Sequence, residues 1–380
     1  MLIYACVSAH GFGHGSRTAS VLTALRGLRP DWRLVVSTTL PRAFLVTALE
    51  EAQGLPAGAA IEIRPCRWDV GVVQADALGA DGPATLAALE NLDEELGATV
   101  AAEAAWLRLQ QEPVLVLADV PPAAARLARS LGAPLAWLGN FGWEAIYGAM
   151  GPAFAPWAAS ALALYRQGDL LLHCPLAMPM DWHLPTLMLG LTCGRPQLEA
   201  EVLRHRLGLP DEPERCVLVS FGGLGFPLDP QRFAAWGDHQ FVVTDPRFNP
   251  EESPSNVRAL PAEVRPLELM PLCGRMITKP GYSSFCEALS QGVGLHVVHR
   301  EGFAEAAVLE QALARHGRHR LLSQSQLQAG DWQLDQPLLP PSGPPLAMDG
   351  AQQAAEALVA LACGRSAGLI GTGTVDLSRH

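Results

Sequence analysis

The residues best suited to chemistry follow a short apolar strand in the second half of the chain. The run Ile277-Thr-Lys-Pro-Gly-Tyr-Ser-Ser-Phe-Cys-Glu287 predicts a strand, a tight turn through Gly281, and a helix that Ser283 and Ser284 can cap. Free backbone N–H groups, two hydroxyls and the positive end of the helix dipole then meet at one point, which favours a phosphate. Glu287 lies about one helical turn further on, where its carboxylate can accept hydrogen bonds from a ribose. We interpret the segment as a cradle for a nucleoside diphosphate; an ordinary strand–turn–helix with a serine cap is the alternative.

A glycine-rich loop, Ser8-Ala-His-Gly-Phe-Gly-His-Gly-Ser-Arg17, follows the first predicted strand. Its three glycines allow the backbone to approach a ligand closely, and they place His14 at the start of the next helix. A neutral histidine there can remove a proton from an attacking hydroxyl. We expect His10, Gly13 and Arg17 to line the same cleft. The alternative is a glycine-rich turn that carries two surface histidines.

Asp119 follows the predicted strand Val114–Ala118. The carboxyl ends of parallel strands face one cleft, so Asp119 is expected to reach His14 and orient its imidazole. A helix N-cap is the other role that an aspartate often has at this position.

Further candidate residues for binding the acceptor and the donor also follow predicted strands. Asn140, Trp143 and Glu144 follow one strand and are expected to bind an acceptor, although the aromatic residues there could simply close the core. In the second half, Gly222 and Gly223 follow the strand Cys216–Phe221. The remaining candidates for donor binding are Lys279, Arg300 and Glu305. Arg300 can offset the phosphate charge, and the carboxylate of Glu305 can accept hydrogen bonds from sugar hydroxyls. The alternative for the last two is a solvated loop with a capping glutamate.

Short apolar runs that alternate with helical patterns must position these residues. The expected strands of the first half are Leu2–Ser8, Arg33–Thr38, Ile61–Pro65, Val114–Ala118, Pro134–Gly139 and Leu170–Cys174. A helix is predicted over Ala84–Gln110 from apolar residues at spacings of three and four. The pattern restarts with strands at Cys216–Phe221, Gln240–Thr244, Val257–Leu260, Arg275–Thr278 and Val293–His299, and it ends with a helix at Ala351–Ala362.

Continuous apolar strands between helices indicate parallel sheets that are covered on both faces. The proline-rich segment Pro175–Pro196 interrupts the alternation and predicts a hinge between two α/β domains. We therefore expect an acceptor domain at 1–178, a linker at 179–196, a nucleotide-sugar domain at 197–364 and a tail at 365–380. Gln324–Pro345 is expected to be a loop.

Composition narrows the function classes. The 380 residues are 49% hydrophobic and only 17% charged, and the formal net charge is −11, which argues against nucleic acid as the main partner. No apolar run is long enough to span a bilayer, and the N-terminus does not have the pattern of a signal peptide. The eight cysteines are scattered, as expected for reduced thiols in a cytoplasmic protein. No zinc-type ligand set is apparent, so neither a metal nor a cofactor is predicted.

Taken together, these motifs resemble a known family. The segments His10–Arg17, Gly71–Leu78, Asp119-Val, Asn140-Phe-Gly-Trp, Lys279–Leu289 and Arg300-Glu-Gly-Phe look like the glycosyltransferase-like domain at the N-terminus of plant arabinokinases and its stand-alone bacterial relatives. More distantly, the chain is similar to GT-B glycosyltransferases. The resemblance spans roughly residues 1–322 and implies two Rossmann-like domains, the second holding most of the nucleotide sugar and the first holding the acceptor.

The resemblance also implies roles for individual residues. His14 matches the position of the base, Asp119 its acidic partner, and Glu287 the glutamate that binds the ribose. Glu305 falls near the acidic residue that holds the donor sugar. Two departures stand out: Ser283-Ser284 replaces the usual Gly-Thr, and Glu305-Ala306 stands where plant-type transferases have Asp-Gln.

We therefore expect an inverting, metal-independent glycosyltransferase that uses a nucleoside diphosphate sugar, UDP-linked, and a small-molecule or glycan acceptor. The alternatives are a nucleotide-sugar epimerase or hydrolase of the same fold and a non-catalytic nucleotide-sugar-binding regulatory protein.

Overall fold

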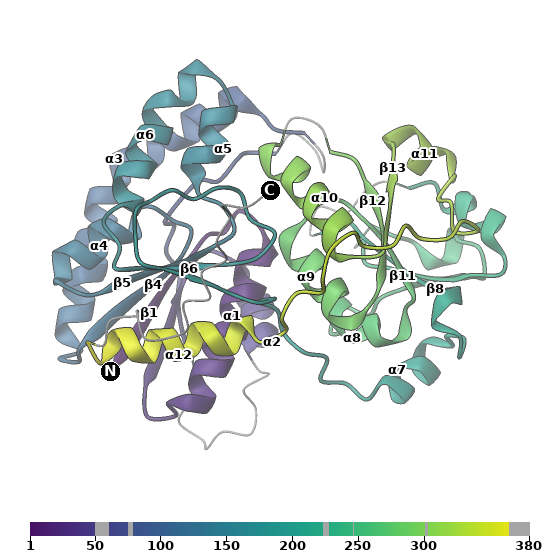
Figure 1. Ribbon diagram of the computed structural model, residues 1–380, viewed down its shortest axis with the longest axis horizontal. Helices are drawn as coiled ribbons and strands as arrows, with labels where there is room; N and C mark the ends of the chain where they lie inside the picture. The colour runs from purple at the N-terminus through teal and green to yellow at the C-terminus, as the bar shows by residue number, and fades with distance from the viewer. Residues whose placement is uncertain (50–60, 75–78, 223–227, 246, 301–302, 365–380) are drawn as a thin grey trace, which may run out of the picture.

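Two parallel β-sheets, each flanked by helices, form two lobes of the protein (Figure 1). The computed structural model describes residues 1–49, 61–74, 79–222, 228–245, 247–300 and 303–364. The first sheet lies in the lobe coloured purple to teal, and the second in the green lobe. The predicted α/β class with two parallel sheets is confirmed.

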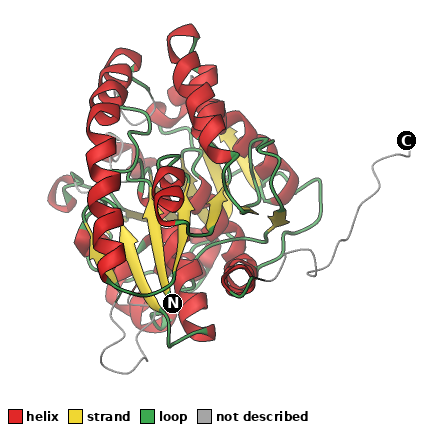
Figure 2. Ribbon diagram, turned by 90° about the vertical axis from the view of Figure 1, so that its left-hand side faces the viewer, coloured by secondary structure: helices red, strands yellow, loops and turns green. Residues whose placement is uncertain are grey.

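The first sheet has the strand order β3-β2-β1-β4-β5-β6-β7, and all its pairs are parallel. Figure 2 shows its strands with helices packed around them. The inner strands are mostly apolar and buried, as expected for a sheet covered on both faces, whereas the edge strands β3 and β7 are partly exposed. Their bounds are β1 Leu2–Val7, β2 Arg33–Ser37, β3 Glu62–Arg64, β4 Val114–Asp119, β5 Leu135–Gly139, β6 Leu170–His173 and β7 Thr186–Met188.

The second sheet has the order β10-β9-β8-β11-β12-β13 and is also entirely parallel. In each sheet the strand order reverses direction beside the first strand, β1 or β8, and ligands of open α/β sheets bind at that point. The strand bounds are β8 Cys216–Ser220, β9 Gln240–Val243, β10 Val257–Ala259, β11 Arg275–Thr278, β12 Gly294–Val298 and β13 His319–Leu322.

The α-helices of the described residues connect these strands, and five short 3₁₀ turns supplement them. The helix bounds are α1 Phe12–Leu28, α2 Arg42–Leu49, α3 Gly82–Leu109, α4 Ala124–Leu131, α5 Trp143–Ala149, α6 Ala155–Tyr165, α7 Ala200–Leu207, α8 Pro266–Leu269, α9 Tyr282–Gln291, α10 Ala304–His316, α11 Gln324–Ala329 and α12 Gly350–Ala362. None of the helices described is long and apolar enough to cross a membrane.

Two short strands add to the expected ones, and a short helix replaces part of the expected loop. Strand β7 lies inside the expected linker 179–196 and pairs with β6 at the edge of the first sheet. Strand β13 pairs with β12 at the edge of the second sheet. Helix α11 lies in the expected loop Gln324–Pro345, where Ser323 and Gln326 form a reciprocal capping box. The loop assignment is therefore wrong over these six residues.

The last helix crosses back to the first lobe. Helix α12 packs along α1, and in Figure 1 it runs in yellow beneath the first sheet. The crossing is tight, because a Cβ on Gly350 would lie 2.1 Å from the Gly190 carbonyl oxygen. Residues 350–362, which the sequence places in the second unit at 197–364, thus complete the packing of the first.

Candidate functional site

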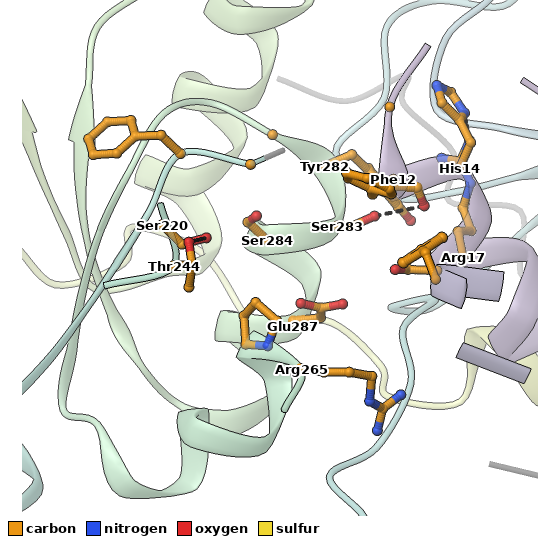
Figure 3. A pocket seen from close by; sticks show the side chains of 18 of the residues that line it. Phe12, His14, Arg17, Ser220, Thr244, Arg265, Tyr282, Ser283, Ser284 and Glu287 are labelled. Carbon is orange, nitrogen blue, oxygen red and sulfur yellow. Dashed lines mark hydrogen bonds between the residues drawn. The ribbon is translucent and has the colours of Figure 1, made fainter. Parts of the chain in front are cut away.

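A cleft of about 1110 Å³ lies between the two lobes, at the carboxyl ends of strands from both sheets. Figure 3 shows His14 and Arg17 on the α1 side and Ser284, Ser220 and Thr244 on the opposite side. Of the predicted site residues, the cleft is lined by His10, Gly13, His14, Arg17, Asn140, Gly222, Lys279, Gly281, Ser283, Ser284, Glu287, Arg300 and Glu305. Gly223 lies outside the described residues.

His14 and Asp119 form a hydrogen-bonded pair, as their positions at two strand ends predict. The His14 Nδ1 atom lies 2.8 Å from Asp119 Oδ1, and Asp119 is completely buried. Helix α4 begins at Ala124, so Asp119 does not cap it. Because Nδ1 is engaged, Nε2 is the nitrogen of His14 that can take a proton from a ligand in the cleft. The arrangement matches a general base held by an acidic partner.

Asp119 has two further partners on α1. The Arg17 guanidinium donates to both carboxylate oxygens, with Nε 2.9 Å from Oδ2, and Thr18 Oγ1 donates to Oδ2 at 3.0 Å. Burial opposes ionisation of Asp119, but Arg17 and His14 outweigh that effect and hold the pKa of the carboxyl below its usual value. The carboxylate therefore stays charged beside His14.

Asn140 connects this network to the second lobe. Its Oδ1 accepts from Arg17 Nη1 at 2.7 Å, and its Nδ2 donates to Glu305 Oε1 at 2.8 Å. Glu305 lies in the first turn of α10, where burial raises the pKa of its carboxyl against the opposing effects of Asn140 and nearby cations. Both polar groups of Asn140 thus have partners, and these contacts join the two lobes at the cleft wall.

The first turn of α9 faces the cleft, but its serines are not caps. Gly281 is the N-cap residue, and Ser283 and Ser284 lie inside the helix. Ser283 Oγ donates to the Gly13 carbonyl at 2.9 Å, which is the dashed contact in Figure 3. The helix N-terminus and Ser284 remain as groups that can meet a phosphate. The prediction that Ser283 and Ser284 cap this helix is wrong, because Gly281 takes the N-cap position.

Cationic and hydroxyl groups surround this helix start. Lys279 and the buried Arg300 both line the cleft, and the Arg300 guanidinium carbon lies 4.2 Å from the centre of the Phe303 ring. Ser220 and Thr244, at the ends of β8 and β9, are joined by a 3.0 Å hydrogen bond between their hydroxyls. This side of the cleft can therefore receive an anion.

Glu287 lines the cleft further along α9, on the side of Arg265 (Figure 3). Burial raises the pKa of its carboxyl to about 7, Arg265 opposes the shift, and Glu268 reinforces it. Glu287 thus changes charge near neutral pH, which the sequence did not indicate.

Two predicted acceptor residues do not reach the cleft. Trp143 is fully buried, and its Nε1 donates to Asp69 Oδ2 at 2.8 Å. Glu144 Oε1 accepts from Trp182 Nε1, so its carboxylate faces the core of the first lobe. Both residues lie in the first turn of α5, and Trp143 belongs to the hydrophobic core of the first lobe, as the core-closure alternative has it.

The structure adds site residues that the sequence reasoning missed. Thr18 is one of them. Its spacing of four from His14 places it with His14 and Arg17 on one face of α1, so the helical period could have identified it. Tyr282 packs under Arg17 across the cleft, with the guanidinium carbon 4.7 Å from the ring centre, and no sequence signal indicates that contact.

Among the described residues, no group of three or more His, Cys, Asp or Glu side chains could hold a metal ion.

Comparisons with known proteins are consistent with this geometry. No protein-family model matches the chain. The sequence is 26% identical over 318 residues to an L-arabinokinase of Arabidopsis thaliana. The match covers 81% of this chain but only 29% of that relative, so the chain spans less than a third of its length. The predicted arabinokinase-like resemblance is confirmed.

Solved structures share the fold. Phytolacca americana UGT2, complexed with UDP-2-fluoro-glucose and pterostilbene, aligns with a TM-score of 0.59 at 15% identity, covering 95% of this chain and 94% of that one. Medicago truncatula UGT71G1, complexed with UDP-glucose, aligns with a TM-score of 0.60 at 12% identity, covering 96% and 95%. The chain therefore has the GT-B fold.

Proposed function

We propose that this GT-B protein is an inverting, metal-independent glycosyltransferase that transfers a sugar from a UDP-linked donor to a hydroxyl acceptor. The observation that carries the proposal is the buried His14–Asp119 pair, which faces the start of α9 across the cleft. A base from one lobe and an anion-binding helix start from the other are what a single displacement at an anomeric carbon requires.

In the proposed reaction, His14 Nε2 takes the proton of the acceptor hydroxyl while that oxygen attacks the anomeric carbon. The new C–O bond forms as the bond between this carbon and the β-phosphate oxygen breaks, and UDP leaves with the electron pair. Asp119 stabilises the imidazolium that results, and Arg17 keeps Asp119 ionised and in place. One displacement inverts the configuration of the anomeric carbon.

The negative charge that develops on the leaving diphosphate has several partners on the second lobe. The start of α9, including Ser284, lines the cleft together with Lys279 and Arg300. These groups can stabilise the leaving group by charge and hydrogen bonding. This supports a reaction in which protein groups take the role that a metal ion has in other transferases.

The acceptor is proposed to lie against the first lobe. There the cleft wall includes Phe12, Leu40, Phe44 and Phe141, with the Phe12 and Phe44 ring centres 4.7 Å apart. An apolar wall beside a single base favours a small molecule that presents a hydroxyl from a hydrophobic body. Two solved structures with this fold contain such molecules, pterostilbene and quercetin.

A binding screen followed by a turnover assay tests the function. We expect UDP and at least one UDP-sugar to raise the melting temperature, because a ligand that binds only the native state stabilises it by mass action. With an acceptor panel, the stabilising UDP-sugar should release UDP and form a glycoside. Binding without consumption across the panel would favour the regulatory alternative, and release of free sugar without acceptor would favour a hydrolase.

A further inference from the structure

His10 is fixed in the cleft by a loop of the first lobe. Its Nδ1 accepts a hydrogen bond from the backbone N–H of Val72 at 3.2 Å. The preceding residue, Gly71, has φ +69°, and a Cβ there would lie 2.5 Å from His10 Nδ1. Tyr147 holds the loop further by donating its hydroxyl to the Gly71 carbonyl at 3.1 Å. The loop thus encloses the ring through a glycine that both the backbone angle and the contact require.

This contact sets the protonation of the ring. A backbone N–H can only donate, so Nδ1 must carry a lone pair, and the neutral ring then has its proton on Nε2. Protonating Nδ1 would leave the Val72 N–H facing another N–H. Burial lowers the pKa of His10 to about 3, and His14, Arg300 and Lys279 act in the same direction. His10 is therefore a neutral ring with one fixed N–H donor.

The ring lies where elements of the second lobe approach the first. It is stacked on Phe303, with ring centres 6.2 Å apart and planes 14° apart, while the Trp143 ring meets it at 88°. Phe303 in turn lies under the Arg300 guanidinium, and Lys279 lines the same cleft as His10. The donor N–H of His10 thus shares its surroundings with the two cations of the proposed diphosphate site.

We propose that His10 Nε2–H donates a hydrogen bond to the β-phosphate of the bound nucleotide sugar. This rests on the proposed function, and it assigns to the donor side a residue that the sequence grouped with the acceptor or cleft residues. The β-phosphate is the group bonded to the anomeric carbon, so it must lie near His14, and His10 lies just before the helix that carries His14. A neutral donor there stabilises the leaving UDP, and because the N–H of a neutral imidazole is a very weak acid, it does not protonate His14.

A matched pair of variants tests the proposal with UDP, UMP and uridine as probes in calorimetry. His10→Phe keeps a ring against Phe303 but has no N–H, whereas the amide nitrogen of His10→Gln can take the position of Nε2. A hydrogen bond to a charged group is worth about 1.5–3 kcal/mol, so we expect His10→Phe to weaken UDP binding about 10- to 100-fold. Binding of UMP and uridine should change less than about threefold, and His10→Gln should retain most of the affinity for UDP.

The outcomes separate this proposal from the proposed function. If the unaltered protein binds no UDP, the function itself is contradicted. If it binds UDP and His10→Phe binds UDP equally well, only the role of His10 is wrong. The same holds if His10→Phe loses as much affinity for uridine as for UDP. A loss seen with UDP-glucose but not with UDP would place His10 on the sugar and would also overturn the proposal.

Nitrogen-15 NMR of the unaltered protein gives a second readout that needs no ligand. The His10 resonances, identified by their loss in His10→Gln, should show the Nε2–H tautomer throughout pH 5–8. An imidazolium signal, or the Nδ1–H tautomer, in that range would overturn the donor assignment.

Discussion

At the scale of residues, Asp119 controls the site through four side-chain hydrogen bonds: one to His14, two to Arg17 and one to Thr18. The meeting of His14 and Asp119 was predictable, because both follow strands of one parallel sheet. The position of Arg17 on Asp119 was not predicted, although its spacing of three from His14 places it on the same face of α1. Trp143 was expected to bind an acceptor but lies in the core. From sequence alone, an aromatic residue at a helix start next to a strand can face either the cleft or the core.

Replacing Asp119 by Asn tests the role of the carboxylate. We expect transfer to fall by about 10²–10⁴-fold, the range of general-base assistance, because the imidazole loses its charged partner. The buried Arg17 also loses its counter-charge, so the variant should unfold about 3–5 kcal/mol more easily. Thr18→Val is the matched control and should cost about 1 kcal/mol. Urea unfolding and turnover measure both effects; an Asn variant with full activity would show that Asp119 has only a structural role.

The titration of Glu287 predicts a pH effect on stability. Its folded-state pKa of about 7 lies above the usual value of a glutamate, so the folded state binds this proton more tightly than the unfolded state. The contribution of Glu287 to stability is therefore greatest at acid pH and is lost as the pH rises toward 7. Because glutamine mimics the protonated form, the stability of Glu287→Gln relative to the unaltered protein should rise between pH 5 and 8. A relative stability that is flat over this range in urea unfolding contradicts the shifted pKa.

At the scale of elements, the two serines in the first turn of α9 have different surroundings. Ser283 donates to the Gly13 carbonyl across the cleft, while Ser284 lies on the cleft wall near the proposed diphosphate. The strand, turn and helix of this segment were predictable from apolar periodicity and the Pro-Gly pair. The division between the serines was not, since Ser283 and Gly13 are 270 positions apart.

Single alanine variants of this turn should therefore differ. We expect Ser284→Ala to weaken UDP binding about tenfold, because it removes a hydroxyl facing a charged group. Ser283→Ala should change UDP affinity less than about threefold, since its hydroxyl is already engaged. Ser290→Ala is a control on the same helix, where the hydroxyl donates to the Glu287 carbonyl. Calorimetry distinguishes them, and a larger loss for Ser283→Ala than for Ser284→Ala would reverse the assignment.

The strands that were missed are short and lie at the edges of the sheets. Strand β7 has three residues and β13 has four, and both are outermost in their sheets. Such strands show too few alternations for a pattern, and the prolines near β7 favoured a linker. Long buried elements such as β1, β4 and α3 carried enough apolar residues to be found with bounds within two residues.

At the scale of the whole molecule, contacts between distant segments assemble the site. Asn140 bonds Glu305, Ser283 bonds Gly13 and Arg17 packs on Tyr282, each pair joining the two lobes. Helix α12 adds a further connection by returning to α1. None of these pairings is encoded in local periodicity, which explains why sequence reasoning predicted both sheets but not how they meet.

The return of α12 predicts that its buried face stabilises the first lobe. Leu358 is completely buried in the same core cluster as Leu22 and Leu25 of α1. We expect Leu358→Ala to destabilise the protein by about 2–5 kcal/mol, as for other buried leucines. Glu356→Ala, on the exposed face of the same helix, should change stability by less than about 0.5 kcal/mol. Equal effects of the two substitutions in thermal unfolding would show that α12 does not pack on α1 in solution.

The most direct test of the central claim compares His14→Ala with the unaltered protein in two assays on the same samples. Calorimetry with UDP measures the donor side of the cleft, and release of UDP from a UDP-sugar in the presence of an accepted hydroxyl compound measures transfer. Because the base belongs to the first lobe and the diphosphate site to the second, His14→Ala should bind UDP as tightly as the unaltered protein. It should lose transfer by at least about 10²-fold. A His14→Ala protein that transfers sugar at the unaltered rate would contradict the account.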